Sequence, residues 1–280
     1  MGEGALFTRH CATKNRSPTS AIRFTCTGPN ARGGEMVPAA DPIALSVIVP
    51  AFNEERRVAA TLGTLCDYLR QQPWDWEIRL VDDGSRDQTA RIGDRFASTE
   101  PRVIVQREPH RGKGGAVKAG LVAARGAYRF MCDADLSMPV GEIPRFLPPV
   151  AAGFDLAIGI REGATARRVG EPAHRHLMGR LFNFAVQRLA LPGIEDSQCG
   201  FKMFTAAAVG SIFPMVTVEG WAFDLEVLIA AREQRMRIVE VPIEWHYREE
   251  SQVAIVRDGF GMLRELLKIR ARAARGAYRL

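Results

Sequence analysis

Residues 45–83 read LSVIVPAFNEERRVAATLGTLCDYLRQQPWDWEIRLVDD, and their pattern sets the architecture of the chain. Two short runs rich in β-branched residues, 45–50 and 77–83, predict strands. The segment between them predicts a helix from about Glu54, because apolar residues recur there at intervals of three and four: Val58, Leu62, Leu65 and Leu69. A strand, a helix and a strand in this order predict a βαβ unit with two parallel strands.

The same alternation of strand-like runs and helical patterns continues to about residue 250. We therefore expect an α/β fold with a Rossmann-like, mostly parallel central sheet flanked by helices, in one domain over residues 43–256. Further strands are expected at RVIVQ (102–106), AYRFMCDAD (127–135), FDLAIGI (154–160), CGFKMF (199–204) and RIVEVPI (237–243). In an open sheet of this kind, ligands bind at the carboxyl ends of the strands.

The positive charge of the chain lies at its two ends. The net charge is +6 over 280 residues, of which residues 1–41 carry +2 and residues 257–280 carry +5. Residues 1–42 are rich in Ser, Thr, Gly, Pro and Arg without an apolar period, which predicts a disordered basic extension, with Met36 as an alternative start. We expect no nucleic-acid partner, because the basic residues form no patch with aromatic residues on the folded body.

Residues 257–280 predict a basic amphipathic helix. One face would carry cations and the other apolar side chains: Arg264, Lys268, Arg272, Arg275 and Arg279 against Phe260, Leu263, Leu267, Ala271 and Ala274. Such a helix favours reversible binding to an anionic membrane surface, and docking on the protein's own body or on a second copy is the alternative.

Two features bear on the cellular compartment. No run reaches the roughly 18 apolar residues of a membrane span, so none is predicted. The cysteines are scattered and nowhere spaced as CxxC, which disfavours a disulfide framework or a zinc site and favours a reducing cytoplasm: Cys11, Cys26, Cys66, Cys132 and Cys199.

Two pairs of acids follow predicted strands. Asp133 and Asp135 end AYRFMCDAD, and Asp82 and Asp83 end the strand at 77–83. Two carboxylates one residue apart at a strand end can share a Mg²⁺ or Mn²⁺ ion that holds a diphosphate. The structural alternative is a capped strand end for Asp133 and Asp135, and an Asx turn before Gly84 for Asp82 and Asp83.

The glycine-rich segment RGKGGAVKAG, residues 111–120, is no Walker A motif, because Lys113 is followed by Gly114 and not by Ser or Thr. The first strand is followed by VPAFNEE and by no GxGxxG, so a dinucleotide site is disfavoured as well. The segment therefore predicts a loop whose backbone amides and Lys113 approach a phosphate or a sugar.

Six motifs follow one another along the chain: VPAFNEE, DDGSRDQT, RGKGGAVKAG, DADLS, QCGFK and GWAFDLE. In this order they resemble the family 2 inverting glycosyltransferases of GT-A fold, and among these the polyprenyl-phosphate (dolichyl-phosphate) sugar synthases, over about residues 45–250. DADLS and SQCGFK resemble the dolichyl-phosphate β-glucosyltransferase branch more than the mannosyl branch. The mannosyl branch would have Gln after the DxD and Arg in place of Lys202.

The resemblance implies a donor site and an acceptor site. For the donor it implies nucleotide binding by Pro50, Phe52, Asn53, Glu55 and one acid of Asp82 and Asp83, and metal and diphosphate binding by Asp133 and Asp135. For the acceptor phosphate it implies Arg161 and Arg175, assisted by Lys202. Ile160 and Gly179 depart from the family pattern, which commonly has small hydroxyl residues there. A solvated basic face is the alternative for both arginines.

A phosphate acceptor fits simple acid–base chemistry. The second pKa of a phosphate monoester lies near ~6, so the group is largely ionised at neutral pH and needs no general base. Arginine forks would orient it. A hydroxyl acceptor would instead need a carboxylate base, for which Asp196 is the candidate, and its alternative role is to cap a turn or pair with an arginine.

The remaining aromatic, acidic and histidine residues receive simpler predictions. Trp221 and Phe223 are expected beside the acceptor entrance, with Asp224 and Glu226 either lining the site or capping a helix. Surface positions are expected for His174 and His176, and packing roles for Trp74, Trp76 and Trp245.

Together with these residues, the resemblance implies a metal-dependent hexosyltransferase that moves glucose from UDP-glucose to a polyprenyl phosphate, and the basic C-terminal helix favours the cytoplasmic face of a membrane. The alternatives are a GDP-mannose-dependent polyprenyl-phosphate mannosyltransferase, a glycosyltransferase with a soluble acceptor, and a nucleotide-sugar-binding module without turnover. A homo-oligomer or a separate membrane partner stays open.

Overall fold

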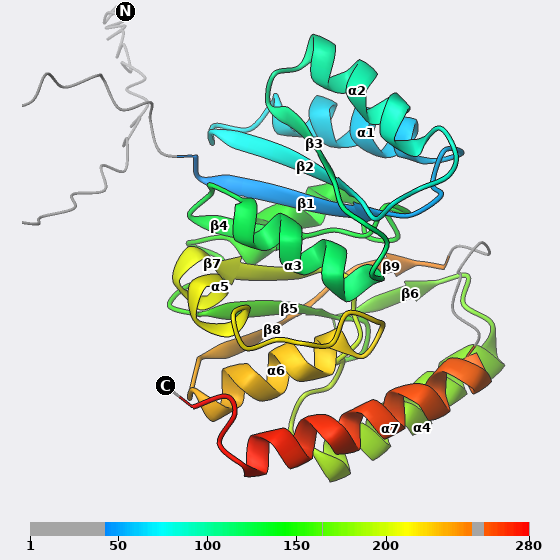
Figure 1. The fold of residues 1–280 in the computed structure, drawn as a ribbon, viewed down its shortest axis with the longest axis vertical. Helices are drawn as coiled ribbons and strands as arrows, with labels where there is room; N and C mark the ends of the chain where they lie inside the picture. The colour runs from blue at the N-terminus through cyan, green and yellow to red at the C-terminus, as the bar shows by residue number, and fades with distance from the viewer. Residues whose placement is uncertain (1–42, 164, 248–254, 280) are drawn as a thin grey trace, which may run out of the picture. The chain divides into compact units, whose positions relative to one another are not determined.

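The computed structural model describes residues 43–163, 165–247 and 255–279, with the side chains of 255–260 left aside. The predicted extension, residues 1–42, lies outside the described residues. The described residues belong to one compact unit, Ala40–Leu280. It is built around a sheet with the strand order β3-β2-β1-β4-β7-β5-β8 (Figure 1). The strands are β1 (Leu45–Ala51), β2 (Trp76–Asp82), β3 (Val103–Arg107), β4 (Tyr128–Met131), β5 (Leu156–Ile160), β7 (Lys202–Thr205) and β8 (Ile238–Pro242).

The mostly parallel sheet predicted from the sequence is confirmed. All strand pairs in this sheet are parallel except the two that β7 makes with β4 and β5. Two further short strands, β6 (Arg167–Val169) and β9 (Glu244–His246), pair with each other apart from it. Because β7 runs backwards, the segment that enters β7 lies at the edge of the sheet where the parallel strands end.

Helices cover both faces of the sheet, as they do in parallel sheets generally. The helices are α1 (Val58–Leu69), α2 (Thr89–Thr99), α3 (Lys113–Ala123), the 3-10 helix η1 (Val140–Phe146), α4 (Ala173–Leu189), α5 (Ala206–Ile212), α6 (Phe223–Glu233) and α7 (Ile255–Ala274). Along β1, Ile48 joins a core with α3, α5 and α6, whereas Val47 and Val49 join a second core with α1 and η1. The alternation of side chains along a strand thus divides the apolar run between two cores.

The first helix begins later than the sequence predicts. It starts at Val58 and not near Glu54, because residues 54 and 55 are held by residues at the start of α2 and just before it. The backbone N–H of Glu54 donates to Thr89 Oγ1 at 2.7 Å, and that of Glu55 donates to Asp87 Oδ2 at 3.1 Å. The loops after β1 and β2 are therefore fastened together at the end of the sheet.

The last helix is present, but its buried side differs from the prediction. α7 packs against α6 and beside α4 (Figure 1), and it buries Leu266, Ile269 and Ala273. The predicted apolar stripe is instead largely open, since Leu267, Ala271 and Ala274 are exposed. No helix in the described residues is both long enough and apolar enough to cross a membrane.

The buried carboxylate of Glu226 connects the C-terminal segment to the body. Tyr278 is fully buried and its hydroxyl donates to Glu226 Oε1 at 2.7 Å, while Arg272 forms an ion pair with the same carboxylate. The backbone N–H groups of Thr217 and Val218 donate to Glu226 Oε2 at 2.8 and 2.7 Å. α6, α7 and the loop before Trp221 thus share one acidic group.

Candidate active site

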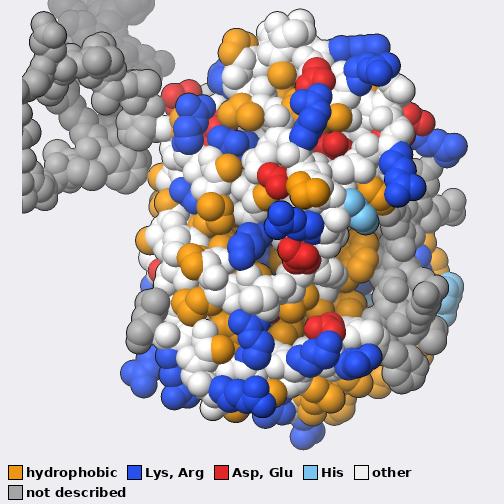
Figure 2. Space-filling view, in the orientation of Figure 1, with side chains coloured by type: hydrophobic (Ala, Val, Ile, Leu, Met, Phe, Trp, Pro, Cys, Tyr) orange, Lys and Arg blue, Asp and Glu red, His pale blue; other side chains and the backbone are white. Residues whose placement is uncertain are grey.

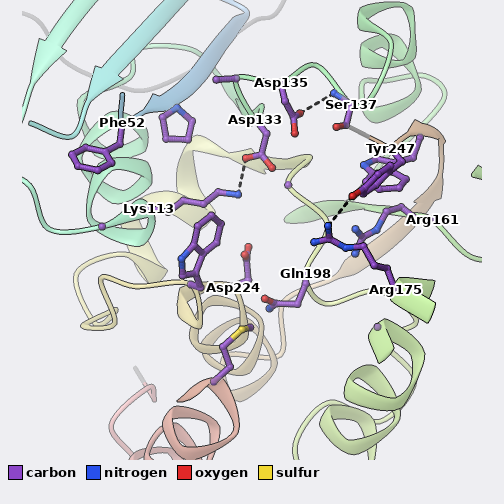
Figure 3. Close-up of a pocket in the computed structure, with 18 of the residues that line it drawn as sticks. Phe52, Lys113, Asp133, Asp135, Ser137, Arg161, Arg175, Gln198, Asp224 and Tyr247 are labelled. Carbon is purple, nitrogen blue, oxygen red and sulfur yellow. Dashed lines mark hydrogen bonds and ion pairs between the residues drawn. The ribbon is translucent and has the colours of Figure 1, made fainter. Parts of the chain in front are cut away.

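A cavity of about 790 Å³ opens at the carboxyl ends of β1, β4 and β5 (Figure 3). Residues that follow these strands line it, and α4 and α7 flank it on the side away from the sheet. Its volume lies in the usual range for small-molecule sites. The crevice at the strand ends that the sequence predicts is therefore present.

Asp133 and Asp135, which follow β4, both line this cavity. Lys113 Nζ lies 2.7 Å from Asp133 Oδ1, and the backbone N–H of Ser137 donates to Asp135 Oδ1 at 2.9 Å. Burial and the neighbouring charge of Asp133 raise the pKa of Asp135. A third carboxylate, that of Glu54, lines the same cavity, and burial together with Asp135 and Asp133 raises its pKa.

The acidic residues fit a divalent cation only with help from a ligand. Within the described residues no group of three or more His, Cys, Asp or Glu side chains could hold a metal ion by itself. Hard carboxylate oxygens suit Mg²⁺ or Mn²⁺, and such ions are often bound by one or two carboxylates together with substrate phosphates. Burial and the charge of Asp133 together raise the pKa of Asp135, and a cation between the two carboxylates would relieve the part that comes from their repulsion.

Gly200, in the segment that enters β7, lets the Asp133 carboxylate lie close to this segment. A Cβ atom at Gly200 would lie 1.8 Å from Asp133 Oδ2, so a side chain at this position would displace the carboxylate. The glycine of the QCGFK motif is thus required by the approach of the DAD motif.

The glycine-rich loop places Lys113 at the start of α3 and inside the cavity. Gly112 has a φ of +106°, and a Cβ there would lie 2.8 Å from the carbonyl oxygen of Glu219. The Lys113 ammonium lies 5.2 Å from the ring centre of Trp221. Burial alone would lower the pKa of Lys113, but the charges of Asp133 and Asp224 outweigh it and the pKa is raised.

The predicted nucleotide residues divide into two groups. Pro50, Phe52 and Asp83 line the cavity, whereas Asp82, Asn53 and Glu55 do not. Asn53 Oδ1 accepts from the backbone N–H of Arg86 at 2.9 Å, and Glu55 Oε2 accepts from that of Gln88 at 3.0 Å. Asp82 Oδ1 accepts from the N–H of Ser85 at 3.3 Å. These three side chains brace the loops around the cavity.

Asp83 organises the glycine-rich loop. Its carboxylate accepts from the backbone N–H groups of Arg111 and Gly112, both at 2.9 Å, and lies 2.8 Å from His110 Nδ1. The His110 ring stacks on Phe52, with ring centres 4.0 Å apart and planes 18° apart. His110 also lines the cavity, so Phe52 and His110 form a stacked aromatic pair at its edge, which the sequence analysis did not predict.

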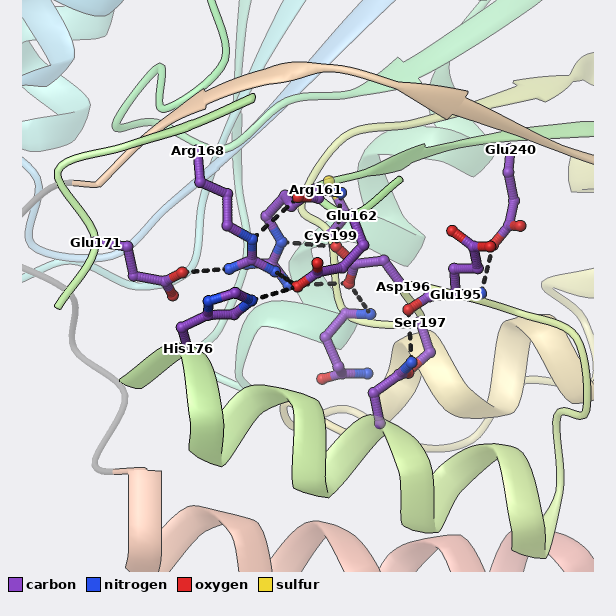
Figure 4. Close-up of polar contacts among 12 residues, drawn as sticks. Arg161, Glu162, Arg168, Glu171, His176, Glu195, Asp196, Ser197, Cys199 and Glu240 are labelled. Carbon is purple, nitrogen blue, oxygen red and sulfur yellow. Dashed lines mark hydrogen bonds and ion pairs between the residues drawn. The ribbon is translucent and has the colours of Figure 1, made fainter. Parts of the chain in front are cut away.

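Arg161, directly after β5, is held by Asp196 (Figure 4). Arg161 Nε donates to Asp196 Oδ2 at 2.7 Å, and Nη2 donates to Oδ1 at 2.9 Å. Burial alone would raise the pKa of Asp196, but the Arg161 guanidinium lowers it overall. Arg161 lines the cavity and Asp196 does not, so the structure favours the arginine-pairing role of Asp196 over that of a base.

Arg175, in the first turn of α4, also lines the cavity. Its Nη1 donates to the hydroxyl of Tyr247 at 2.8 Å (Figure 3). The Trp245 ring lies 5.3 Å from the Arg161 guanidinium carbon and lines the cavity, so the packing role predicted for Trp245 is incomplete. Trp245 and Tyr247 are two positions apart, a spacing that points both side chains to the same side of an extended segment.

Lys202 lies beneath the cavity and not in its wall. It is fully buried, its Nζ donates to the carbonyl of Cys199 at 2.5 Å, and it lies 2.7 Å from Asp224 Oδ1. The predicted contact of Lys202 with an acceptor phosphate is therefore wrong in this structure, because a buried carboxylate already neutralises the ammonium. Asp224 itself lines the cavity, and burial raises its pKa against the opposing charges of Lys202 and Lys113.

Gln198 carries a buried polar atom without a partner. Its side-chain amide nitrogen Nε2 has no hydrogen-bond partner among the described residues, and the residue lines the cavity near Arg161 (Figure 3). Leaving such a donor unmatched costs about 1–3 kcal/mol, so unmatched groups call for an explanation. Gln198 belongs to the QCGFK motif, and this motif was the feature of the sequence that could have identified Gln198 as a site residue.

The other predicted side chains are placed as follows. Trp76 is buried and Trp74 packs against a core, as predicted. His174 is exposed, but His176 Nε2 lies 2.7 Å from Glu162 Oε1, in a cluster with Arg168 (Figure 4). Trp221 lines the cavity, and Phe223 is buried in the core.

The chain is similar in sequence to dolichyl-phosphate β-glucosyltransferases of several organisms. The chain is 31% identical to a dolichyl-phosphate β-glucosyltransferase of Saccharomyces cerevisiae, over 85% of this chain and 78% of that protein. It is 34% identical to the human protein of the same name, over 84% and 78%.

Solved structures share the fold. Mannosyl-3-phosphoglycerate synthase from Rubrobacter xylanophilus matches with a TM-score of 0.61 and 21% identity, over 85% of this chain and 76% of that one. Glucosyl-3-phosphoglycerate synthase from Mycobacterium tuberculosis, in complex with Mn²⁺, UDP-glucose and glycerol 3-phosphate, matches with a TM-score of 0.57 and 19% identity, over 81% and 78%. Residues 46–213 match the sequence profile of Glycosyl transferase family 2, and the chain therefore belongs to this family of glycosyltransferases.

Proposed function

We propose that this chain transfers glucose from UDP-glucose to a polyprenyl phosphate of the dolichyl type, with inversion at the anomeric carbon, giving a β-linked product. The observation that carries the proposal is that two carboxylates, Asp133 and Asp135, and two guanidinium groups, Arg161 and Arg175, line one cavity. The printed names of the curated relatives support glucose as the sugar and dolichyl phosphate as the acceptor.

The acidic end of the cavity is the proposed donor end. A Mg²⁺ or Mn²⁺ ion held there by Asp133, Asp135 and the donor phosphates would neutralise charge on the departing nucleoside diphosphate. Lys113 is positioned to contact the same phosphates, since its ammonium already lies against Asp133. The stacked pair of Phe52 and His110 offers an aromatic surface for the base.

The basic end of the cavity is the proposed acceptor end. A phosphate monoester with a second pKa near ~6 is ionised at neutral pH and attacks without a general base. Arg161 and Arg175 would orient it, and Asp196 holds the guanidinium plane of Arg161 in place. A hydroxyl acceptor would need Asp196 as a free base, and its ion pair with Arg161 disfavours that role.

The basic surface of α7 supports a place at the cytoplasmic face of a membrane. Lys and Arg side chains gather along the edge of the molecule over α7 (Figure 2), and Arg264, Lys268 and Arg275 are exposed. Cations near an anionic bilayer contribute about 1 kcal/mol each. Replacing these three by Gln should weaken binding to anionic vesicles at low salt, and undiminished binding would overturn this part of the proposal.

Purified protein with Mg²⁺ and radiolabelled UDP-glucose or GDP-mannose tests the reaction. Each donor is incubated alone, with a polyprenyl phosphate, or with 3-phosphoglycerate, and we measure donor binding, the label in the organic and aqueous phases and the nucleoside diphosphate released. We expect lipid label from UDP-glucose only. Lipid label from GDP-mannose would make the chain a mannosyltransferase, aqueous product would show a soluble acceptor, and donor binding without release of nucleoside diphosphate would exclude turnover.

A further inference from the structure

We infer that an apolar groove between α4 and α7 binds the first isoprene units of a prenyl phosphate whose head lies at Arg161 and Arg175. This inference rests on the proposed function and adds a binding site to it. The groove is part of the cavity already described and is walled by apolar side chains of both helices: Met178, Leu181, Phe182 and Ala185 from α4, and Met262 and Leu263 from α7.

The shape of the lining matches an amphiphile with one charged end. Arg175 stands in the first turn of α4, and the apolar positions 178, 181, 182 and 185 follow along the next turns of the same helix. A phosphate held by Arg175 would therefore have its chain directed along α4. Figure 3 shows α4 and α7 on the two sides of the cavity.

The groove continues into exposed apolar side chains on the same two helices. Leu177, Leu181 and Phe184 of α4 are 69%, 62% and 57% exposed, and Leu267 of α7 is 54% exposed. Positions 177, 181 and 184 share one helix face. A grouped set of large exposed apolar residues marks an interaction surface, whereas single ones do not.

The charge around these apolar residues is complementary to anionic lipid. α4 contains Arg175, Arg180 and Arg188 and no acidic residue. Arg264, Lys268 and Arg270 are exposed on α7. Apolar side chains bordered by cations are the pattern of surfaces that lie in a bilayer interface. A prenyl chain could then pass from the bilayer into the groove without crossing water.

A chain-length experiment tests the groove. Ala185→Trp fills the groove at the last α4 position that lines it, and Ala123→Trp, at an exposed position that ends α3 outside the cavity, is the matched control. The KM of the wild-type protein should be at least about tenfold lower for a prenyl phosphate of four isoprene units than for one of a single unit, since burial of two methylene groups alone is worth about that factor. Ala185→Trp should abolish this preference and leave the KM for UDP-glucose unchanged, and Ala123→Trp should keep it.

The outcomes separate the two proposals. A wild-type protein that glucosylates no prenyl phosphate contradicts the proposed function. A wild-type protein that glucosylates them, with the same chain-length preference in Ala185→Trp, contradicts the groove alone.

Photochemical cross-linking gives a second measurement that needs no variant. A prenyl phosphate with a diazirine on its second isoprene unit should label the wild-type tryptic peptides 181–188 and 258–264, and excess unlabelled prenyl phosphate should suppress the labelling. Labelling confined to other peptides would place the chain elsewhere and overturn the inference. Labelling of these peptides that a prenyl alcohol suppresses equally well would show an apolar surface without a phosphate-directed site, and would overturn it too.

Discussion

Arg161 and Asp196 form a two-point ion pair, with Nε to Oδ2 at 2.7 Å and Nη2 to Oδ1 at 2.9 Å. The backbone N–H of Arg161 donates to the same carboxylate at 3.2 Å. Two parallel contacts fix the plane of a guanidinium as well as its position. Asp196 is thus a positioning residue for the arginine that faces the cavity.

Asp196→Asn should therefore weaken acceptor binding more than the chemical step. We expect the KM for polyprenyl phosphate to rise about tenfold, the worth of one charge-assisted hydrogen bond, with a smaller change in kcat. Arg161 holds the pKa of Asp196 below its ordinary value, so the ion pair stabilises the protein above about pH 4 and is lost as the pH falls further. Asp196 would instead be a general base if the kcat of the wild-type protein depended on pH near neutrality and Asp196→Asn removed this dependence without changing the KM.

Asp135→Asn should lower turnover by at least about a hundredfold without lowering the melting temperature. The side-chain oxygen of the introduced asparagine can still accept from the Ser137 N–H. Burial raises the pKa of the Asp135 carboxyl group, which means that its negative charge does not stabilise the fold, so removing it should not lower the melting temperature. Turnover measured against Mg²⁺ concentration, beside thermal unfolding, tests this. Asp67→Asn, at an exposed position on α1, is the control and should change neither. Full activity in Asp135→Asn would remove this residue from the proposed metal site.

Gln198→Met should lower turnover without lowering stability, whereas most substitutions lower stability. It removes the buried amide nitrogen that has no partner among the described residues, so the free energy of unfolding should stay the same or rise. If that nitrogen donates to a substrate, turnover should fall about tenfold. Gln71→Met, at an exposed position after α1, should alter neither quantity. Unchanged turnover in Gln198→Met would show that the amide contacts neither substrate.

Tyr278→Phe should lower the free energy of unfolding by about 1–3 kcal/mol, because it removes one donor from the buried Glu226 carboxylate. Urea unfolding measures this loss. Tyr68→Phe is the matched control, since the Tyr68 hydroxyl has no hydrogen-bond partner among the described residues. Equal stabilities of the two variants would show that the hydroxyl of Tyr278 contributes nothing to docking of the C-terminal segment.

The sequence predicted the elements whose pattern is local. Strands β1 and β2 and the helix between them follow from the apolar spacing within residues 45–83. The β-branched residues of these strands are buried in the two cores. The DAD motif could be placed for a related reason, since the position of a residue at a strand end follows from the strand itself. The same holds for Lys113 at the start of α3.

Contacts between distant segments were not predictable in this way. Lys202 reads as a free cation until α6 brings Asp224 to 2.7 Å from it, and only the tertiary fold supplies that neighbour. The buried side of α7 depends likewise on α6, because a helix with apolar residues on more than one side has no unique inward face until a partner is present. Trp245 was assigned to packing for the same reason, since its place beside Arg161 comes from the pairing of β9 with β6.

The antiparallel β7 has a consequence for synthesis of the chain. β4 precedes the DAD motif, and its second edge is covered only when residues 202–205 pair with it. A growing polypeptide that has emerged as far as α4 therefore presents β4 as an open edge, the feature most prone to pairing with foreign strands. Fragments that stop before residue 202 should aggregate, and the acidic half of the active site becomes a stable structure only late in translation.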